Sequence, residues 1–184
     1  MKNYIILNNN KVDVSNSDPN SSLLDWLRIE KDLKGTKEGC AEGDCGACSI
    51  LLSPVIGGDL RPANSCLLKL GQVCGSDIFT VEGIGSQDKP NLVQNALTDF
   101  GGTQCGFCTP GFVISISSLL NKTKRPKESD IHDALAGNLC RCTGYKPIID
   151  AIYNVEEKLD LKNCSPWMES NNFFSDESNF FYPK

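Results

Sequence analysis

Short apolar runs in the first half of the chain predict β-strands. Residues 4–7 are apolar, three asparagines follow as a turn signal, and residues 11–14 alternate polar and apolar side chains. This pattern predicts a β-hairpin. Two further strands are expected at residues 49–52 and 78–81, and Gly83 marks the end of the second one.

In the second half, apolar residues recur with the period of an α-helix. One helical face is expected over residues 92–100. The predicted starts of three further helices are Thr109-Pro110 ahead of an apolar stretch at 112–120, Ser129, and Pro147. A single shorter helix, capped by Ser21 or Ser22, is expected in the first half.

Strands therefore precede residue 84 and four helices follow it. This order favours two small domains of the α+β class over one interleaved sheet. We expect a first domain at residues 1–84, a second at 85–160, and a polar linker at 161–184. The isolated aromatic residues of that linker are expected to dock on a neighbouring surface.

Composition and charge narrow the function classes. Apolar residues make up 40% of the 184-residue chain, and the net charge is −5, with Lys and Arg scattered along it. The N-terminus lacks a signal-peptide pattern, and serines interrupt an apolar stretch that is too short to span a bilayer. We expect a soluble, cytoplasmic protein with no nucleic-acid or membrane partner.

Ten cysteines, at positions 40, 45, 48, 66, 74, 105, 108, 140, 142 and 164, are the main chemical feature. In a reducing compartment, grouped cysteines indicate metal binding or redox chemistry more often than disulfides. Cys74 is interpreted as a small core residue and Cys164 as an incidental free thiol. The single histidine, His132, is expected on a solvated helix surface, and Trp26 in the core.

The first cysteine group has the spacing C-x4-C-x2-C followed by a distant fourth cysteine, Cys66. This is the spacing of plant-type [2Fe–2S] ferredoxins. Neighbouring glycines allow the loop to wrap closely and to aim backbone N–H groups at sulfur. The alternative, a zinc knuckle, prefers paired C-x2-C units, so the spacing favours a cluster.

The second cysteine group, C-x2-C followed by C-x-C, is compatible with zinc or with a cluster on spacing alone. Both pairs directly precede predicted helix starts. Two helix N-termini that converge on one centre would favour an anionic ligand such as an iron–sulfur cluster.

Four runs of sequence resemble one family: GTKEGCAEGDCGACSILL, NSCLLKLGQVCGSDIFTVEG, QCGFCTPGF and ALAGNLCRCTGY. They resemble, in the same order, the iron–sulfur portion of the molybdenum hydroxylases, the xanthine dehydrogenase and aldehyde oxidase family. The resemblance covers about residues 2–160. It implies a β-grasp ferredoxin domain followed by a four-helix-bundle domain, with one [2Fe–2S] cluster in each.

The resemblance also implies which residues bind the cofactors. The implied ligands are Cys40, Cys45, Cys48 and Cys66 for the first cluster, and Cys105, Cys108, Cys140 and Cys142 for the second. Gln104 and the backbone at Cys142 are implied to touch a molybdopterin held by another chain or domain. No residue of this chain is expected to act as a catalytic acid, base or nucleophile.

By resemblance, the chain is an electron-transfer subunit of an oxidoreductase and best matches a bacterial xanthine dehydrogenase small subunit. Electrons from purine hydroxylation would pass singly from the molybdopterin centre through both clusters to FAD. The implied partners are a molybdopterin-binding large subunit and an FAD-binding domain or subunit, in a hetero-oligomer. The ending NFFYPK resembles the start of such a flavin domain. A subunit for an aldehyde, carbon monoxide or N-heterocycle, and a zinc-stabilised interaction module, remain alternatives.

Overall fold

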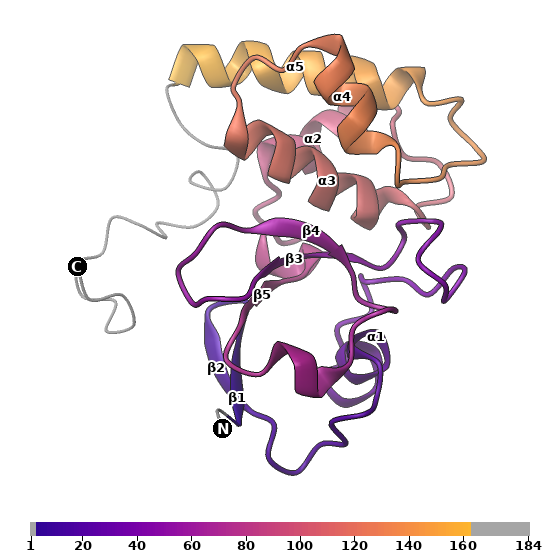
Figure 1. Cartoon of the computed structure of the whole chain (residues 1–184). Coiled ribbons are helices and arrows are strands. Elements are labelled where there is room, and N and C mark those ends of the chain that lie inside the picture. Colours follow the sequence, from indigo (N-terminus) through magenta and orange to yellow (C-terminus); the bar gives the residue numbers. More distant parts are fainter. Residues whose placement is uncertain (1–2, 163–184) are drawn as a thin grey trace.

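A computed structural model describes residues 3–162 of the chain as a mixed β-sheet with helices above and beside it (Figure 1). The strands are β1 (Tyr4–Leu7), β2 (Asn10–Asp13), β3 (Ser49–Ser53), β4 (Arg61–Asn64) and β5 (Asp77–Phe79). The helices are α1 (Leu23–Asp25), which continues as a π-helical segment (Trp26–Glu30), α2 (Leu92–Asp99), α3 (Thr109–Lys122), α4 (Glu128–Leu135) and α5 (Lys146–Lys162). Short 3-10 turns lie at Leu70–Val73 and Val81–Gly83.

The sheet has the strand order β2-β1-β5-β3-β4. Only β1 and β5 pair in parallel, and the other neighbours are antiparallel. The predicted hairpin is confirmed as β1 and β2. Asn8 and Asn9 occupy its turn with φ values of 46° and 70°, the left-handed region that a tight two-residue turn requires and that asparagine tolerates. Asn10, expected in the turn, belongs to β2.

Several predicted boundaries are wrong by a residue or two. The strand expected to reach residue 81 ends at Phe79, because the Thr80 N–H donates to the side chain of Asn8 instead of to a neighbouring strand. α4 begins ahead of Ser129, where the Lys127 N–H donates to the carboxylate of Asp130. The strand β4 was not predicted, because it contains a proline. It lies at the edge of the sheet, where a residue without a backbone N–H does not interrupt the hydrogen bonds between strands.

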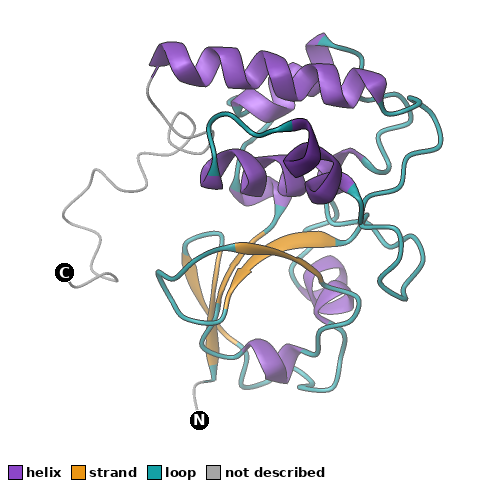
Figure 2. Ribbon diagram, turned by 45° about the horizontal axis from the view of Figure 1, so that its top comes forward, coloured by secondary structure: helices purple, strands orange, loops and turns teal. Residues whose placement is uncertain are grey.

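The two faces of the sheet contribute to two different cores. Ile50 and Ile78 pack in a core with Trp26, which is buried as predicted. Their neighbours Leu51 and Phe79 point to the other face and pack in the helical core. Helix α3 lies on this second face of the sheet, as Figure 2 shows. The two halves of the chain therefore share a buried interface.

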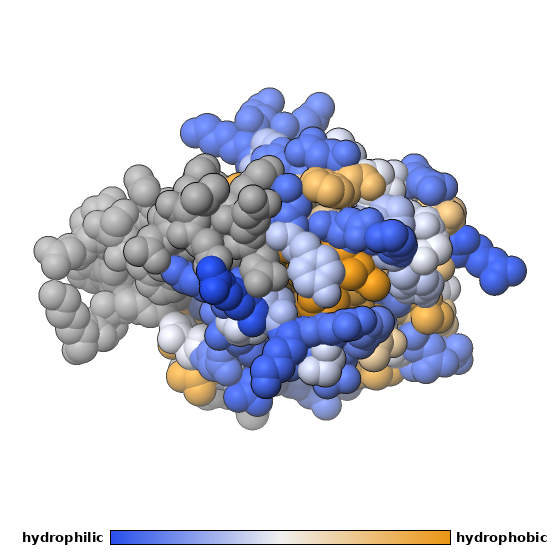
Figure 3. Space-filling view, turned by 90° about the horizontal axis from the view of Figure 1, so that it is seen from above, coloured by the Kyte–Doolittle hydropathy of each residue, from blue (hydrophilic) through white to orange (hydrophobic). Residues whose placement is uncertain are grey.

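Two predictions concern residues that lie outside the described range. These are the predicted linker, apart from its first two residues, and the interpretation of Cys164. Within residues 3–162, no helix is long and apolar enough to cross a membrane. Viewed from above, the helical half presents a mostly hydrophilic surface with small apolar patches (Figure 3).

Candidate metal centres

The first site is formed by the loop that leads into β3 and by the residues after β4. Cys48 directly precedes β3, and Cys66 follows β4. The antiparallel pairing of these strands aligns Ser49 with Asn64 and so brings the two thiols together. The Sγ atoms of Cys48 and Cys66 share a hydrogen bond of 3.4 Å. Burial, together with this hydrogen bond, raises the pKa of Cys66 to about 11.

The other two cysteines of the first site lie in the exposed loop before Cys48. The backbone N–H groups of Glu42 and Asp44 point at Cys40 Sγ, at nitrogen-to-sulfur distances of 3.5 and 3.2 Å. The N–H of Glu42, more than any other group, lowers the pKa of Cys40 to about 7, and the Cys45 thiol adds a further hydrogen bond. The loop thus places donors around sulfur as its glycine-rich sequence predicts.

The second site combines the loop before α3 with the loop before α5. Its thiols lie in two pairs, Cys105 with Cys142 and Cys108 with Cys140, and the members of each pair shift one another's pKa. Cys108 also occupies the N-cap position of α3, so that Thr109, expected as the cap, is the first helical residue. Two helix N-termini therefore adjoin this site.

Each pair of the second site joins a thiol of raised pKa to one of lowered pKa. The Phe107 N–H is the main cause that lowers the pKa of Cys105. The interaction of Cys142 with Cys105 raises the pKa of Cys142. Burial raises the pKa of Cys108 to about 12. Burial also raises the pKa of Cys140, but hydrogen bonds, chiefly from Thr143, outweigh it and leave that pKa lowered.

A direct connection runs between the two sites. The Leu139 N–H, next to Cys140, donates to the carbonyl oxygen of Cys45 at 3.0 Å. One residue away, the buried Asn138 side chain donates to the Gly46 carbonyl at 3.2 Å. Sequence reasoning missed Asn138, because a polar residue in a loop carries no signal of a partner 92 positions away.

Two residues that follow the C-x-C motif also contact the second site and were missed. The Tyr145 hydroxyl accepts a hydrogen bond of 2.9 Å from the Cys140 N–H, and the Thr143 hydroxyl lies 3.2 Å from Cys140 Sγ. The available sequence signal was the run T-G-Y directly after the last cysteine, where the glycine indicates a turn that folds back on the motif.

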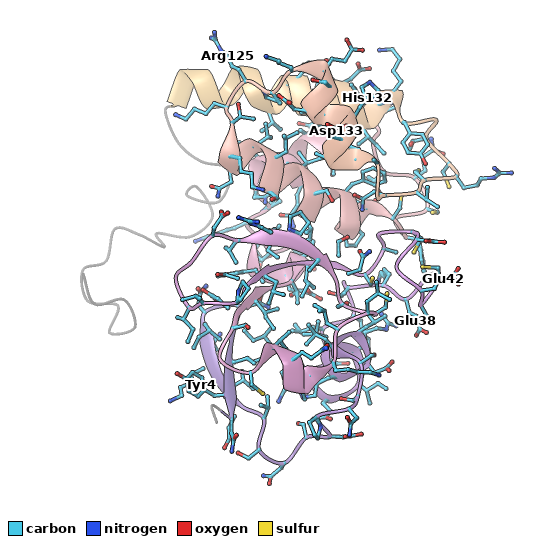
Figure 4. All side chains as sticks on the ribbon, viewed as in Figure 1. Tyr4, Glu38, Glu42, Arg125, His132 and Asp133 are labelled. Atoms are coloured by element: carbon cyan, nitrogen blue, oxygen red, sulfur yellow. The ribbon has the colours of Figure 1, made fainter. Side chains whose placement is uncertain are left out.

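The sites reach the surface along the edge where the sheet meets the helices. Cys105, Cys142 and Gln104 are exposed, and so are three apolar neighbours of the cysteines: Leu67 (59% exposed), Phe107 (48%) and Leu139 (55%). Glu38 and Glu42, on the first cysteine loop, project outward at this edge (Figure 4).

His132 is placed elsewhere, on the outer surface of α4 (Figure 4). Its imidazole is exposed and lies 3.7 Å from the carboxylate of Glu128. The expected surface position of His132 is confirmed.

At both sites the potential metal ligands are four cysteine thiols, and these thiols lie in two pairs. Among residues 3–162, no three ligating side chains already converge on the position of a single ion. A [2Fe–2S] cluster contains two irons with two protein ligands each, so two pairs of thiols per site fit that group. Binding would require the shared protons of each pair to leave.

Comparison with known proteins agrees with this chemistry. Residues 80–153 match the family of [2Fe-2S] binding domains. The chain is 47% identical over 150 residues to a xanthine dehydrogenase from Blastobotrys adeninivorans, covering 79% of this chain but only 11% of that protein. It is 43% identical over 141 residues to the nicotinate dehydrogenase small FeS subunit of Eubacterium barkeri, covering 76% of this chain and 86% of that one.

A solved structure is similar over most of its length. The crystal structure of quinoline 2-oxidoreductase from Pseudomonas putida 86 contains a chain that is 35% identical, with a TM-score of 0.74. The match covers 88% of this chain and 96% of that one. The match therefore covers nearly the whole length of some relatives and about a tenth of the length of others.

Proposed function

The chain belongs to the [2Fe–2S]-binding family shared by xanthine dehydrogenases, aldehyde oxidases and the small FeS subunits of bacterial molybdenum hydroxylases, and from this premise we propose that it is a two-cluster electron carrier. Its sheet half would be a β-grasp ferredoxin domain and its helices a four-helix cluster-binding domain. When bound, each cluster supplies a site that accepts and releases one electron at a time.

The observation that carries the proposal is the pairing of the eight thiols. Two pairs at each site match the two irons of a [2Fe–2S] cluster. The pairs are Cys40 with Cys45 and Cys48 with Cys66 at the first site, and Cys105 with Cys142 and Cys108 with Cys140 at the second.

The connection between the loops supports transfer between the two sites. A single hydrogen bond, from the Leu139 N–H to the Cys45 carbonyl, joins the backbone next to Cys140 to a ligand residue of the first site. The chain's contribution is to hold both sites at a fixed separation. Rigid spacing of this kind, together with tuning of each site, is what a protein supplies to redox groups.

We further propose that the exposed edge faces partners. Gln104 and the backbone at Cys142 would contact a molybdopterin on a large subunit or domain, and an FAD-binding unit would receive the electrons. The exposed Leu67, Phe107 and Leu139 support burial of this edge, because apolar side chains grouped on a surface favour an interface.

Purine hydroxylation is the proposed reaction of the whole assembly and is drawn from the 47% identity to a xanthine dehydrogenase, while the human aldehyde oxidase is 48% identical over the same length. The chain spans about a tenth of that relative, and the family also contains proteins named for nicotinate, quinoline and aldehydes. Purification of the chain with its natural partners, followed by assays with hypoxanthine, nicotinate and an aldehyde, tests the substrate. Turnover of nicotinate or the aldehyde without hypoxanthine would contradict the purine proposal.

Metal analysis of the purified chain tests the electron-carrier role. We expect roughly four irons and four sulfides per chain, a brown colour, and two distinguishable paramagnetic signals on reduction. A colourless protein with about one zinc per site and no sulfide would instead establish the zinc-stabilised interaction module.

A further inference from the structure

Cys140 lies in a closed ring of hydrogen bonds made by the two residues missed from the sequence. Its backbone N–H donates to the Tyr145 hydroxyl at 2.9 Å. The Tyr145 N–H donates to the Thr143 hydroxyl oxygen at 3.2 Å. The Thr143 oxygen in turn lies 3.2 Å from Cys140 Sγ. Backbone and side chain of one cysteine are therefore both engaged by the segment that follows it.

The direction of the Thr143 to Cys140 bond follows from the chemistry of a metal ligand. A cysteine that binds iron is a thiolate, so its sulfur has no proton and can only accept. The Thr143 oxygen already accepts from the Tyr145 N–H, which leaves the hydroxyl proton free to point at sulfur. In the metal-loaded protein, Thr143 is then the donor to Cys140 Sγ.

The ring is held by the helical core. Tyr145 has a φ of 68°, a left-handed backbone that turns the chain back toward Cys140 just before α5. Its aromatic ring meets the buried Phe112 of α3 edge-on, with centroids 6.2 Å apart. Thr143 is half-buried, so its hydroxyl is partly shielded from competing water.

We propose that Thr143 raises the reduction potential of the second site by donating its hydroxyl to Cys140 Sγ. This inference rests on the proposed function, since it needs a redox group on these thiols. Reduction adds one electron and makes the ligand sulfurs more negative. A donor to sulfur therefore binds more strongly in the reduced state, and hydrogen bonds to ligand sulfurs are a recognised determinant of cluster potential.

The Thr143 donor is a side chain, whereas Cys40 Sγ accepts from the backbone N–H groups of Glu42 and Asp44. Substitution can therefore remove this donor while every backbone group stays in place, and the Tyr145 N–H then loses its acceptor as well. Thr143→Val keeps the shape and deletes the hydroxyl, Thr143→Ser keeps the hydroxyl, and Thr143→Ala is a second hydroxyl-free variant. The first site remains unchanged in all three and is an internal reference.

The test is a mediated redox titration of the full 184-residue chain, loaded anaerobically with iron and sulfide and monitored by electron paramagnetic resonance. For Thr143→Val we expect about a tenfold loss of electron affinity at the second site, equivalent to about 59 mV for a one-electron couple. The first-site potential should stay constant, and Thr143→Ser should stay close to wild type.

Each alternative result has a defined meaning. The inference is overturned if the second-site potential is unchanged in Thr143→Val and Thr143→Ala, or if it drops equally in Thr143→Ser. In either case, two loaded sites in the wild type would still uphold the proposed function. Failure of both hydroxyl-free variants to load the second site also overturns it, because Thr143 would then hold the ligand rather than tune it. A wild-type chain that binds no iron overturns both proposals.

Discussion

The side chain of Asn138 donates a hydrogen bond of 3.2 Å to the carbonyl oxygen of Gly46, which ties the loop of the second cysteine group to that of the first. Asn138 is 96% buried, and its side-chain amide oxygen Oδ1 accepts a hydrogen bond of 2.6 Å from the Ser115 hydroxyl on α3. One amide therefore positions both loops against one helix.

Asn138→Ala should destabilise the chain by about 1–3 kcal/mol, because the buried Ser115 hydroxyl loses its acceptor and the Gly46 carbonyl loses one donor. Urea unfolding followed by circular dichroism measures this change. The control is Asn20→Ala, an exposed asparagine in the turn before α1, which should have little effect. Equal stability of both variants would show that Asn138 does not link the halves.

Gly111→Ala tests the close approach of α3 to the first loop. A Cβ at Gly111 would collide with the backbone carbonyl of Gly46, so that helix and loop must separate. We expect a loss of about 1–3 kcal/mol in unfolding free energy, as for other overpacked sites. The matched control is Gly137→Ala, where an added Cβ has open space. In thermal unfolding, the melting temperature of Gly111→Ala should lie below that of wild type, whereas that of Gly137→Ala should not. A lower melting temperature for Gly137→Ala than for Gly111→Ala would contradict the observed packing.

Tyr145→Phe removes the hydroxyl that accepts from the Cys140 N–H and keeps the ring contact with Phe112. The free energy of unfolding should fall by about 1 kcal/mol, the contribution of a typical hydrogen bond. Because the second loop is then less well held, iron loading of that site should decrease while the first-site signal stays constant. Spin quantitation of the two signals measures both, and an equal decrease at both sites would argue against a local role.

The two sites should lose metal independently when single ligands are replaced. Cys48→Ser and Cys108→Ser should each reduce iron from roughly four to roughly two per chain, and each should remove a different paramagnetic signal. Cys74→Ser is the control, since Cys74 packs against the core of the sheet half and belongs to neither group of four cysteines. Retention of full iron content by either ligand variant would exclude that cysteine as a ligand.

Alkylation of the iron-free chain should depend on pH as the pKa values of its thiols require. The thiolate is the reactive form, so lowering the pKa of Cys40 to about 7 should make its rate rise about tenfold between pH 6 and pH 8. The pKa of Cys66, raised to about 11, keeps it a slow thiol over the same range. Peptide mapping after iodoacetamide treatment measures both rates, and comparable rates at pH 7 would contradict these assignments.

Much of the fold was predictable because its signals are local. Alternation and the asparagine turn identified the β1–β2 hairpin, a period of 3.6 residues identified α2, and the Thr109-Pro110 start identified α3. The prediction missed β4, because Pro62 masks its strand pattern. The strand is stabilised by pairing with β3, which the local sequence does not reveal. It also misplaced the end of β5, which a side chain from another strand, Asn8, determines.

The sequence by itself determined the chemistry of this protein: the number and spacing of its cysteines, the glycines among them, and the order of strands before helices. Only the tertiary structure decided which thiols form pairs, that Asn138 joins the two loops, and that Thr143 faces Cys140 Sγ. The reason is physical. Spacing and periodicity act within a few residues, whereas a hydrogen bond between residues 46 and 138 exists only once the sheet and helices have packed.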